Sequence, residues 1–313
     1  MPAKLFALIA AAAALSALGQ QAAPVGGTPV EFPTATLAGG GESLRGLLWR
    51  PSGTSRGSVV LVHGSSGWTD AREGHYARAL SAAGYTVLAI DAFSSRGITS
   101  TAEDQTRITT LQMTLDAFSA RRYLIGAGAD PRRTAVMGFS KGGQVSLYAA
   151  DLTFLPSQPE RFQVVIPVYP GCNARVKQPK PASAMFMLLG EKDDYTGTTT
   201  CAAIATDYER AGGSVRVKIY PNSTHAFDGD PRYTSAYRLP TVENYMNCVA
   251  EVEPDGSLTY AGKSYAQGET AALARDMKTT CMKKGATFWT NLSQKQRATE
   301  DVTNFLHEVF PAR

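Results

Sequence analysis

Residues 134–143 read Thr-Ala-Val-Met-Gly-Phe-Ser-Lys-Gly-Gly, and no other stretch of the chain is as informative. It begins as a short apolar run and continues into residues 144–150, which are compatible with a helix. A strand, a sharp turn and a helix in this order are the context of a Gly-x-Ser-x-Gly motif, whose turn exposes a nucleophilic serine. Glycines are needed because so tight a turn leaves no room for side chains beside Ser140, which is held in a strained conformation.

Short apolar runs recur along the chain and alternate with stretches of helical length. Near-continuous apolar runs are typical of strands buried on both faces of a parallel sheet. We predict strands at residues 58–62, 86–90, 134–137, 164–168, 184–189 and 215–220, an opening hairpin at 34–48, and helices near 72–83, 103–126, 141–151 and 199–211. This alternation predicts an α/β fold, a doubly wound, mostly parallel sheet with helices on both faces. Ligands bind such sheets at the carboxyl ends of the strands.

The region of about residues 229–292 departs from this alternation and precedes a last predicted helix near 295–309. Residues 248–265 have the pattern of a hairpin that turns at Asp255-Gly256, and residues 271–284 have a helical pattern. We interpret the region as a C-terminal insertion. It either flanks the active site or is a surface elaboration held by a disulfide.

The N-terminus has the features of a secretory signal peptide. Lys4 precedes an apolar, alanine-rich run that ends near Leu18, and small residues up to Ala23 supply cleavage sites. A membrane anchor is the alternative, but the run is shorter than the ~20 residues that span a bilayer. We therefore predict a signal peptide at residues 1–23 and an exported protein, periplasmic or secreted, without stable membrane association after cleavage.

The remaining chain, residues 24–313, is long enough for one large α/β domain with a buried core. The formal net charge is only +4, and the basic residues are scattered along the sequence. Proteins that bind nucleic acids cluster their basic side chains. The composition therefore argues against a nucleic-acid partner.

Four cysteines form an even set in a chain predicted to be exported, which favours disulfides. Three pairings are possible, and the chain order suggests Cys172–Cys201 and Cys248–Cys281. Each of these would close a loop of roughly 30 residues, worth ~3–4 kcal/mol on the chain-entropy estimate. A metal site is the alternative, but the sequence has neither a Cys-x-x-Cys spacing nor a histidine pair nearby, so we predict no metal.

A serine hydroxyl becomes an effective nucleophile only when a neighbouring base accepts its proton. The chain has four histidines. His63 ends a predicted strand before Ser140, and His75 and His307 fall in predicted helices. Only His225 lies in a loop directly after a strand that follows the serine, so we predict that it is the base and not a surface residue.

The base in turn needs an acid that orients it. Residues 188–194 place three carboxylates directly after a predicted strand. We prefer Asp193 to Asp194, because neighbouring side chains must point in different directions and the end of a Gly-x-x-Asp loop suits the inward position. Glu191 ranks third. The resulting chain order, serine then aspartate then histidine, is that of α/β-hydrolases.

Acyl transfer also needs N–H groups that stabilise an oxyanion. One is predicted to be the backbone N–H of Lys141, the first residue after the nucleophile. The other is expected from the glycine-containing turn at residues 63–67, where Ser65 is preferred and Ser66 is next. The alternative interpretation of this turn is a plain connection between a strand and a helix.

Three motifs together resemble the dienelactone hydrolase family of α/β-hydrolases. Residues 138–143 (GFSKGG), 190–194 (GEKDD) and 220–227 (YPNSTHAF) resemble its nucleophile, acid and histidine motifs. The resemblance covers roughly residues 30–228 and the last helix, and it implies the α/β-hydrolase fold.

The chain departs from this family at two positions. Dienelactone hydrolases have a cysteine nucleophile where this chain has Ser140, and a glutamate coupled to it where the turn at residues 63–65 has glycine. The resemblance therefore implies an ordinary serine esterase without the thiol chemistry of the family. Members also hold a substrate carboxylate with an arginine that corresponds to Arg96, which is otherwise expected to be solvated or paired.

Trp68, Phe139 and Tyr195 flank the predicted site, where aromatic residues either line a substrate pocket or simply pack. The sequence thus predicts an exported carboxylic ester hydrolase that cleaves a small-molecule ester through an acyl-Ser140 intermediate, with no cofactor. Two alternatives stay open. One is a peptidase or acyltransferase with the same triad, and the other is a catalytically inert binding protein of this fold.

Overall fold

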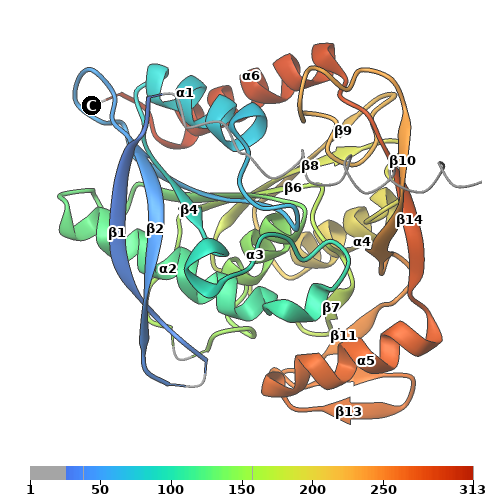
Figure 1. The fold of residues 1–313 in the computed structure, drawn as a ribbon. Coiled ribbons are helices and arrows are strands. Elements are labelled where there is room, and N and C mark those ends of the chain that lie inside the picture. The colour runs from blue at the N-terminus through green and yellow to red at the C-terminus, as the bar shows by residue number, and fades with distance from the viewer. Residues whose placement is uncertain (1–25, 38, 157, 313) are drawn as a thin grey trace, which may run out of the picture.

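The computed structural model describes residues 26–37, 39–156 and 158–312, so the predicted signal peptide lies outside the described residues. An eight-stranded sheet crosses the molecule in the order β1-β2-β4-β3-β5-β6-β8-β9 (Figure 1). Its strands are β1 (Thr28–Ala35), β2 (Gly41–Trp49), β3 (Ser58–Val62), β4 (Thr86–Asp91), β5 (Thr134–Phe139), β6 (Val164–Val168), β8 (Ala184–Gly190) and β9 (Val215–Tyr220). From β4 to β9 all neighbours are parallel, whereas β1 and β2 add an antiparallel hairpin. The predicted doubly wound, mostly parallel sheet is confirmed.

Helices cover both faces of the sheet. Helices α1 (His75–Ala82) and α6 (Leu292–Val309) lie on one face, and α2 (Thr110–Gly126), α3 (Lys141–Ala149) and α4 (Thr198–Arg210) lie on the other (Figure 1). In β3, Val59 and Leu61 pack toward α1 and α6, while Val60 and Val62 pack toward α2 and α3. Because successive strand side chains alternate between faces, covering both faces explains the near-continuous apolar run.

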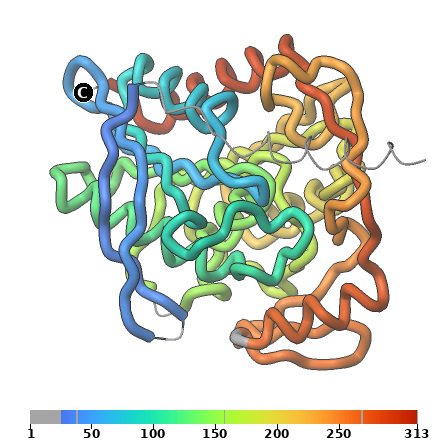
Figure 2. Tube along the Cα trace, viewed as in Figure 1, coloured from blue at the N-terminus to red at the C-terminus, as the bar shows by residue number. Residues whose placement is uncertain are grey.

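The insertion between β9 and α6 forms its own strands and one helix. These are β10 (Tyr237–Asn244), β11 (Ala250–Val252), β12 (Leu258–Tyr260), β13 (Lys263–Tyr265), α5 (Thr270–Thr280) and β14 (Lys283–Phe288). Strand β10 pairs with β14, and β11–β13 extend β7 (Ala174–Val176) of the main body into a four-stranded sheet. Figure 2 shows the insertion, in orange and red, along one side of the main body.

Two predicted helix boundaries are wrong. The helix expected over 103–126 begins only at Thr110, because Ile108 and Thr109 are extended and the Thr109 hydroxyl accepts the Gln112 N–H as an N-cap. The helix expected over 271–284 ends at Thr280. Cys281 leaves the helical conformation with a φ of −136°, and Lys283 and Lys284 then pair with β10 as the start of strand β14.

Two disulfides join the cysteine pairs suggested by chain order. Cys172–Cys201 connects the loop after β6 to α4, and Cys248–Cys281 connects the segment before β11 to the end of α5. The second bond therefore lies entirely within the insertion. Among the described residues, no helix combines the length and the apolar character needed to cross a membrane.

Candidate active site

Ser140 stands at the turn between β5 and α3, with a φ of 56° and a ψ of −113°. A Cβ at Gly138 would lie 1.8 Å from the carbonyl oxygen of Gly142, and a Cβ at Gly142 would lie 2.1 Å from the carbonyl oxygen of Val62. Any side chain at either position would collide with backbone. The two glycines therefore allow the strained turn that presents the serine hydroxyl.

His225 reaches this serine from the loop that follows β9. Its Nε2 lies 2.8 Å from Ser140 Oγ, and its Nδ1 lies 2.9 Å from Asp193 Oδ2. Because the carboxylate accepts the Nδ1 proton, Nε2 carries a lone pair that can accept the serine proton. The histidine is only 2% exposed, which shields this arrangement from water.

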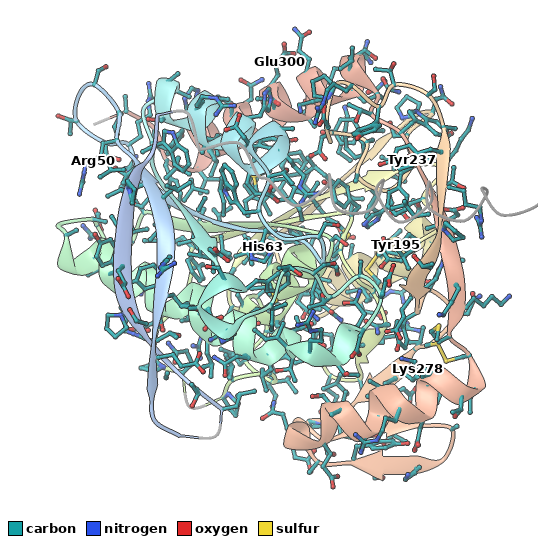
Figure 3. All side chains as sticks on the ribbon, viewed as in Figure 1. Arg50, His63, Tyr195, Tyr237, Lys278 and Glu300 are labelled. Carbon is teal, nitrogen blue, oxygen red and sulfur yellow. A yellow bond between two sulfur atoms is a disulfide. The ribbon has the colours of Figure 1, made fainter. Side chains whose placement is uncertain are left out.

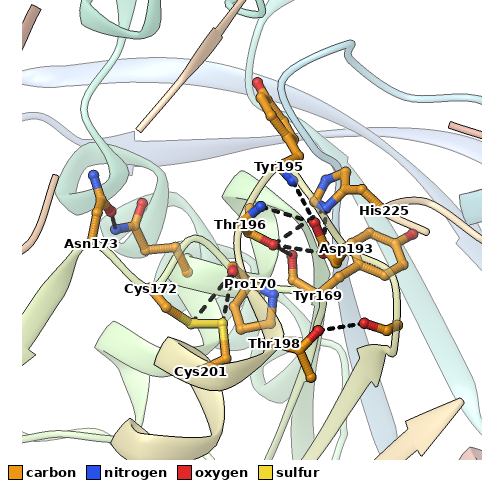
Figure 4. The surroundings of a disulfide bond; sticks show 12 residues. Tyr169, Pro170, Cys172, Asn173, Asp193, Tyr195, Thr196, Thr198, Cys201 and His225 are labelled. Carbon is orange, nitrogen blue, oxygen red and sulfur yellow. Dashed lines mark hydrogen bonds and ion pairs between the residues drawn. A yellow bond between two sulfur atoms is a disulfide. The ribbon is translucent and has the colours of Figure 1, made fainter. Parts of the chain in front are cut away.

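Asp193 is held by backbone as well as by the histidine (Figure 4). The N–H groups of Tyr195 and Thr196 each donate to Oδ1 at 2.9 Å, and the Thr196 hydroxyl donates to Oδ2 at 2.8 Å. Burial disfavours the charged carboxylate, but His225 and these N–H groups outweigh burial and lower the pKa of Asp193. The aspartate therefore stays ionised and keeps the imidazole oriented.

The neighbouring carboxylates have other partners. Asp194 accepts the N–H of Thr287 in β14 at 2.8 Å, and Glu191 accepts the N–H of Asn222 at 2.8 Å. Of the three predicted candidates, Asp193 is thus the one within hydrogen-bonding distance of His225.

The other histidines make structural contacts. His63 Nδ1 donates to the carbonyl of Gly64, its Nε2 accepts the Ala92 N–H, and burial lowers its pKa. His75 bonds Thr299, and His307 contacts the Ala83 carbonyl. His63 therefore fixes the start of the turn at residues 63–67.

The predicted oxyanion donors come from two separate segments of the chain that both line the pocket at Ser140. Lys141 opens α3, so its N–H is one of the first-turn groups that have no partner within the helix. Ser65 lines the same pocket as Ser140. Its carbonyl accepts the Thr101 N–H at 2.8 Å and the Ser100 hydroxyl at 3.1 Å, which fixes the turn.

A pocket of about 170 Å³ opens beside Ser140. Its walls come from the start of α2, from α3, from the loop between β6 and β7, and from the insertion. Its lining residues include Thr110, Leu111, Gln144, Asn173, Leu258, Leu273 and Met277. Across residues 26–37, 39–156 and 158–312, no group of three His, Cys, Asp or Glu side chains is arranged to hold a metal ion.

Of the four predicted substrate-binding residues, the structure brings Tyr195 to the pocket. Its ring packs edge-on against His225, with ring centroids 4.8 Å apart. Phe139 is wholly buried and packs on Tyr76, because its side chain leaves β5 toward α1. Trp68 belongs to the same core and lies off the pocket lining. The pocket interpretation of Phe139 and Trp68 is therefore wrong.

The carboxylate-binding interpretation of Arg96 is also wrong. Its guanidinium donates to both oxygens of Asp116, at 2.7 and 2.9 Å, and to Glu42 at 2.7 Å. The Asp116 side chain is fully buried, and that of Arg96 is 12% exposed. Arg96 is thus already paired and serves to link its loop to α2.

Sequence reasoning missed two further residues of the site. Thr196 had a local signal, since an aspartate commonly accepts N–H groups two and three residues further on. Gln105 had none. It contacts Ser65, Lys141 and the insertion from the segment before α2, which the sequence had assigned to the helix expected over 103–126.

Burial changes the pKa of the Lys141 side-chain amine. Its Nζ donates to the Gln105 carbonyl at 2.9 Å and to the Gln105 side chain at 3.3 Å. Desolvation lowers the pKa of Lys141 to about 7, although Asp104 and Glu243 oppose this change. The pocket therefore holds an amine that titrates near neutral pH.

The sequence and the fold of this chain are similar to those of known proteins. The sequence model of the dienelactone hydrolase family matches residues 44–247. "Protein usf" of Aquifex pyrophilus is 29% identical over 104 residues, which are 33% of this chain and 42% of that protein. A protein of Aquifex aeolicus, provisionally named a carboxymethylenebutenolidase, is 29% identical over 108 residues, again 33% and 42% of the two chains. The match thus spans about two fifths of the length of these curated relatives.

Among solved structures, a thermophilic esterase of Thermogutta terrifontis is similar with a TM-score of 0.54. The sequence identity is 15%, and the alignment covers 68% of this chain and 87% of the esterase. At this identity the likeness shows a shared fold.

Proposed function

The chain belongs to the dienelactone hydrolase family, and from this premise we propose that it is an exported serine hydrolase that cleaves carboxylic esters through an acyl-serine intermediate. One observation carries the proposal. Ser140 Oγ, His225 and Asp193 are linked by hydrogen bonds of 2.8 and 2.9 Å in a site that is almost closed to water. Such an arrangement activates a serine for acyl transfer.

In the first half of the reaction, Ser140 Oγ attacks the ester carbonyl carbon while His225 Nε2 takes its proton. The carbonyl oxygen becomes an oxyanion and accepts the N–H groups of Lys141 and Ser65. When the intermediate collapses, the bond to the alcohol oxygen breaks and His225 returns the proton to that oxygen. The alcohol leaves, and the acyl group stays on Ser140.

In the second half, His225 takes a proton from water and the hydroxide attacks the acyl carbon. Collapse breaks the bond to Ser140 Oγ, which recovers the proton from His225, and the acid leaves. Asp193 stays ionised throughout and stabilises the imidazolium that forms twice. The steps need no cofactor.

A serine nucleophile favours ordinary ester hydrolysis over the thiol chemistry of dienelactone hydrolases. The glycine that stands in place of the coupled glutamate, Gly64, lies where a side chain would be crowded by the nucleophile turn. A Cβ at this position would lie 3.1 Å from the Phe139 carbonyl oxygen and 3.2 Å from Ser140 Cβ.

The test is hydrolysis of p-nitrophenyl esters, from acetate to palmitate, by the wild type and Ser140→Ala. We expect turnover in the wild type and a loss on the order of 10⁶-fold in the variant. Anilide substrates and alcohol acceptors, run in parallel, separate an esterase from a peptidase or acyltransferase. If the wild type neither hydrolyses these esters nor reacts with a fluorophosphonate, the proposal is overturned in favour of an inert binding protein.

Export is supported by the signal-like residues 1–23 and by two disulfides, which persist in oxidising compartments. N-terminal sequencing of the full chain after expression in a bacterium tests it. We expect an exported protein that starts within residues 18–24. A protein that stays in the cytoplasm with Met1 in place contradicts export.

A further inference from the structure

We propose that the insertion roofs an acyl-binding pocket, and that Leu273 and Met277 of α5 limit the substrates to esters of short apolar acids. This inference rests on the proposed esterase function and names the substrate class of the same site. It assigns a role to the insertion, which the sequence left as either a flank of the active site or a surface elaboration.

The roof is apolar where it faces the main body. Leu273 and Met277 are 6% and 3% exposed, and both line the pocket together with Leu258 of β12. They belong to one apolar cluster with Leu111 of α2, which lies in the opposite wall. The insertion therefore closes the pocket with aliphatic side chains, which favour an apolar substrate group.

The polar side chains of the opposite wall are already bonded to one another. The Thr110 hydroxyl donates to Gln144 Oε1 at 2.8 Å, and Gln144 Nε2 donates to Asn173 Oδ1 at 2.7 Å. These partners satisfy much of the hydrogen-bonding capacity of the Gln144 amide. An apolar acyl group can thus lie against this wall without leaving its amide unpaired.

The position of the pocket assigns it to the acyl half of the ester. The leaving alcohol must lie against His225 Nε2 to receive its proton. The described residues that line the pocket include Ser140 but not His225. The acyl group, which is bonded to Ser140 in the intermediate, is therefore the half that enters the pocket.

The roof is tied to the main body at its inner edge. Glu243 of β10 is 1% exposed, accepts the Gln105 N–H at 3.1 Å and pairs with Lys278 of α5 at 2.5 Å. Figure 3 labels Lys278 and Tyr195 on the side of the molecule where the insertion packs. These ties hold α5 in place, so its side chains set the depth of the pocket.

The volume of the pocket limits the size of the acyl group. The pocket of about 170 Å³ is close to the ~150 Å³ of an engineered apolar cavity that binds benzene. We therefore expect the best acyl groups to contain about four to six carbons, and longer chains to collide with the roof.

The experiment compares kcat/KM over the p-nitrophenyl series from acetate to palmitate. Met277→Trp fills the pocket, and we expect activity on hexanoate to fall by roughly 10-fold or more, with acetate changed by less than about 3-fold. Leu273→Ala enlarges the pocket, and the optimum should move toward octanoate. Arg275→Trp is the matched control, because Arg275 lies on the exposed side of the same helix, and its profile should match the wild type.

Each outcome bears on one proposal. If both pocket variants keep the wild-type chain-length profile, the roof does not select the acyl group and this inference is overturned. If the wild type hydrolyses no ester, the proposed function itself fails. Thermal unfolding shows whether Met277→Trp folds. If it does not, the chain-length profile of Leu273→Ala alone decides the test, because this truncation does not overpack the pocket.

Discussion

Gln105 links three parts of the candidate site through one residue. Its side-chain amide lies within 3.1 Å of Ser65 Oγ, its carbonyl accepts from Lys141 Nζ, and its N–H donates to Glu243. The residue thus connects the turn that contains Ser65, the Lys141 side chain and the insertion, and so connects both proposed oxyanion donors. We assign it a positioning role, because its hydrogen bonds go to the two residues proposed as oxyanion donors, although its side chain also lines the pocket.

Gln105→Ala should therefore lower kcat and leave KM within about 3-fold. Removing one oxyanion donor outright costs about 10²–10³-fold, and a loosened turn should cost less, roughly 10-fold to 100-fold. Gln105→Glu keeps acceptors for Ser65 and Lys141 and should recover part of the rate. The measurement is steady-state kinetics on p-nitrophenyl butyrate, with exposed Glu103→Ala as control. A rise in KM at constant kcat would contradict the positioning role.

The buried amine of Lys141 predicts a dependence of stability on pH. Its pKa is about 7 in the folded protein and ordinarily about 10.5, so between these values the unfolded chain binds the extra proton. The stability that depends on the neutral amine is complete above the higher value and is lost progressively as the pH falls from there to about 7. Lys141→Met removes the group and should gain stability relative to wild type at acid pH.

Urea unfolding of both proteins at pH 6 and pH 9 measures the effect of Lys141→Met. The free energy of unfolding of the variant, relative to wild type, should be higher at pH 6 than at pH 9 by about 2–3 kcal/mol. The same difference at both pH values would show that the amine keeps its ordinary pKa.

The structure brings together the residues that a motif and chain order predicted, and it places elsewhere those whose position depends on a tertiary partner. The motif and chain order led to Ser140, and order with loop position led to the histidine and the aspartate. The carboxylate that pairs with Arg96 belongs to Asp116, which lies 20 residues away on α2. No local sequence pattern predicts this pair. Phe139 failed for a simpler reason, since the final residue of a buried strand can face either layer of helices.

At the scale of elements, the Arg96–Asp116 pair connects the loop after β4 to α2, and the Thr34 hydroxyl of β1 donates to the same aspartate at 2.9 Å. Burial raises the pKa of Asp116, although its bonds with Arg96 oppose this. A buried carboxylate of this kind depends on its cation, because removing one partner leaves an uncompensated charge.

Arg96→Ala should lower the free energy of unfolding by about 3–5 kcal/mol. The rate on p-nitrophenyl esters should stay near wild type, because Arg96 does not line the pocket. Replacing the aspartate as well, in Arg96→Ala with Asp116→Asn, should restore part of the stability by removing the stranded charge. Urea unfolding and kcat/KM are the two measurements. A loss of activity without a loss of stability would return Arg96 to the substrate site.

Element boundaries were hardest to predict where the chain leaves the main sheet. Strands buried on both faces were recognisable from composition alone, whereas β10 and β14 were not expected. Exposed residues such as Tyr237 and Leu239 in β10, and Lys283 and Lys284 in β14, do not have the pattern of a buried strand. Strands β10 and β14 pair with each other, and the Thr287 N–H of β14 also donates to Asp194. These tertiary contacts leave no local pattern in the sequence.

At the scale of the whole molecule, the sheet and the insertion contribute different parts of the candidate site. The loops at the carboxyl ends of β5, β8 and β9 carry Ser140, Asp193 and His225, as expected for a doubly wound sheet. The pocket beside Ser140 also needs the insertion, which supplies part of its lining. The fold class could be predicted from periodicity, but the shape of the pocket could not, because it depends on how two separately patterned regions pack.

The Cys248–Cys281 bond should therefore stabilise the roof more than the main body. It closes a loop of 33 residues that contains β11, β12, β13 and α5, and such a loop is worth ~3–4 kcal/mol. In Cys248→Ser with Cys281→Ser, we expect limited proteolysis to cut first between residues 249 and 280, before the sheet is attacked. Selectivity between butyrate and octanoate esters should fall roughly 10-fold, because a mobile α5 no longer limits the acyl group.

Cys172→Ser with Cys201→Ser is the matched control for this disulfide. That bond closes 29 residues of the main body, so its loss should lower the melting temperature while the segment between residues 249 and 280 stays protected. Mass spectrometry of the first cleavage products distinguishes the two variants. Because the roof also pairs with β7 and is held by Glu243, the first variant should still hydrolyse acetate esters. Equal protection of the segment in both variants would mean that these contacts, and not the disulfide, hold the roof in place.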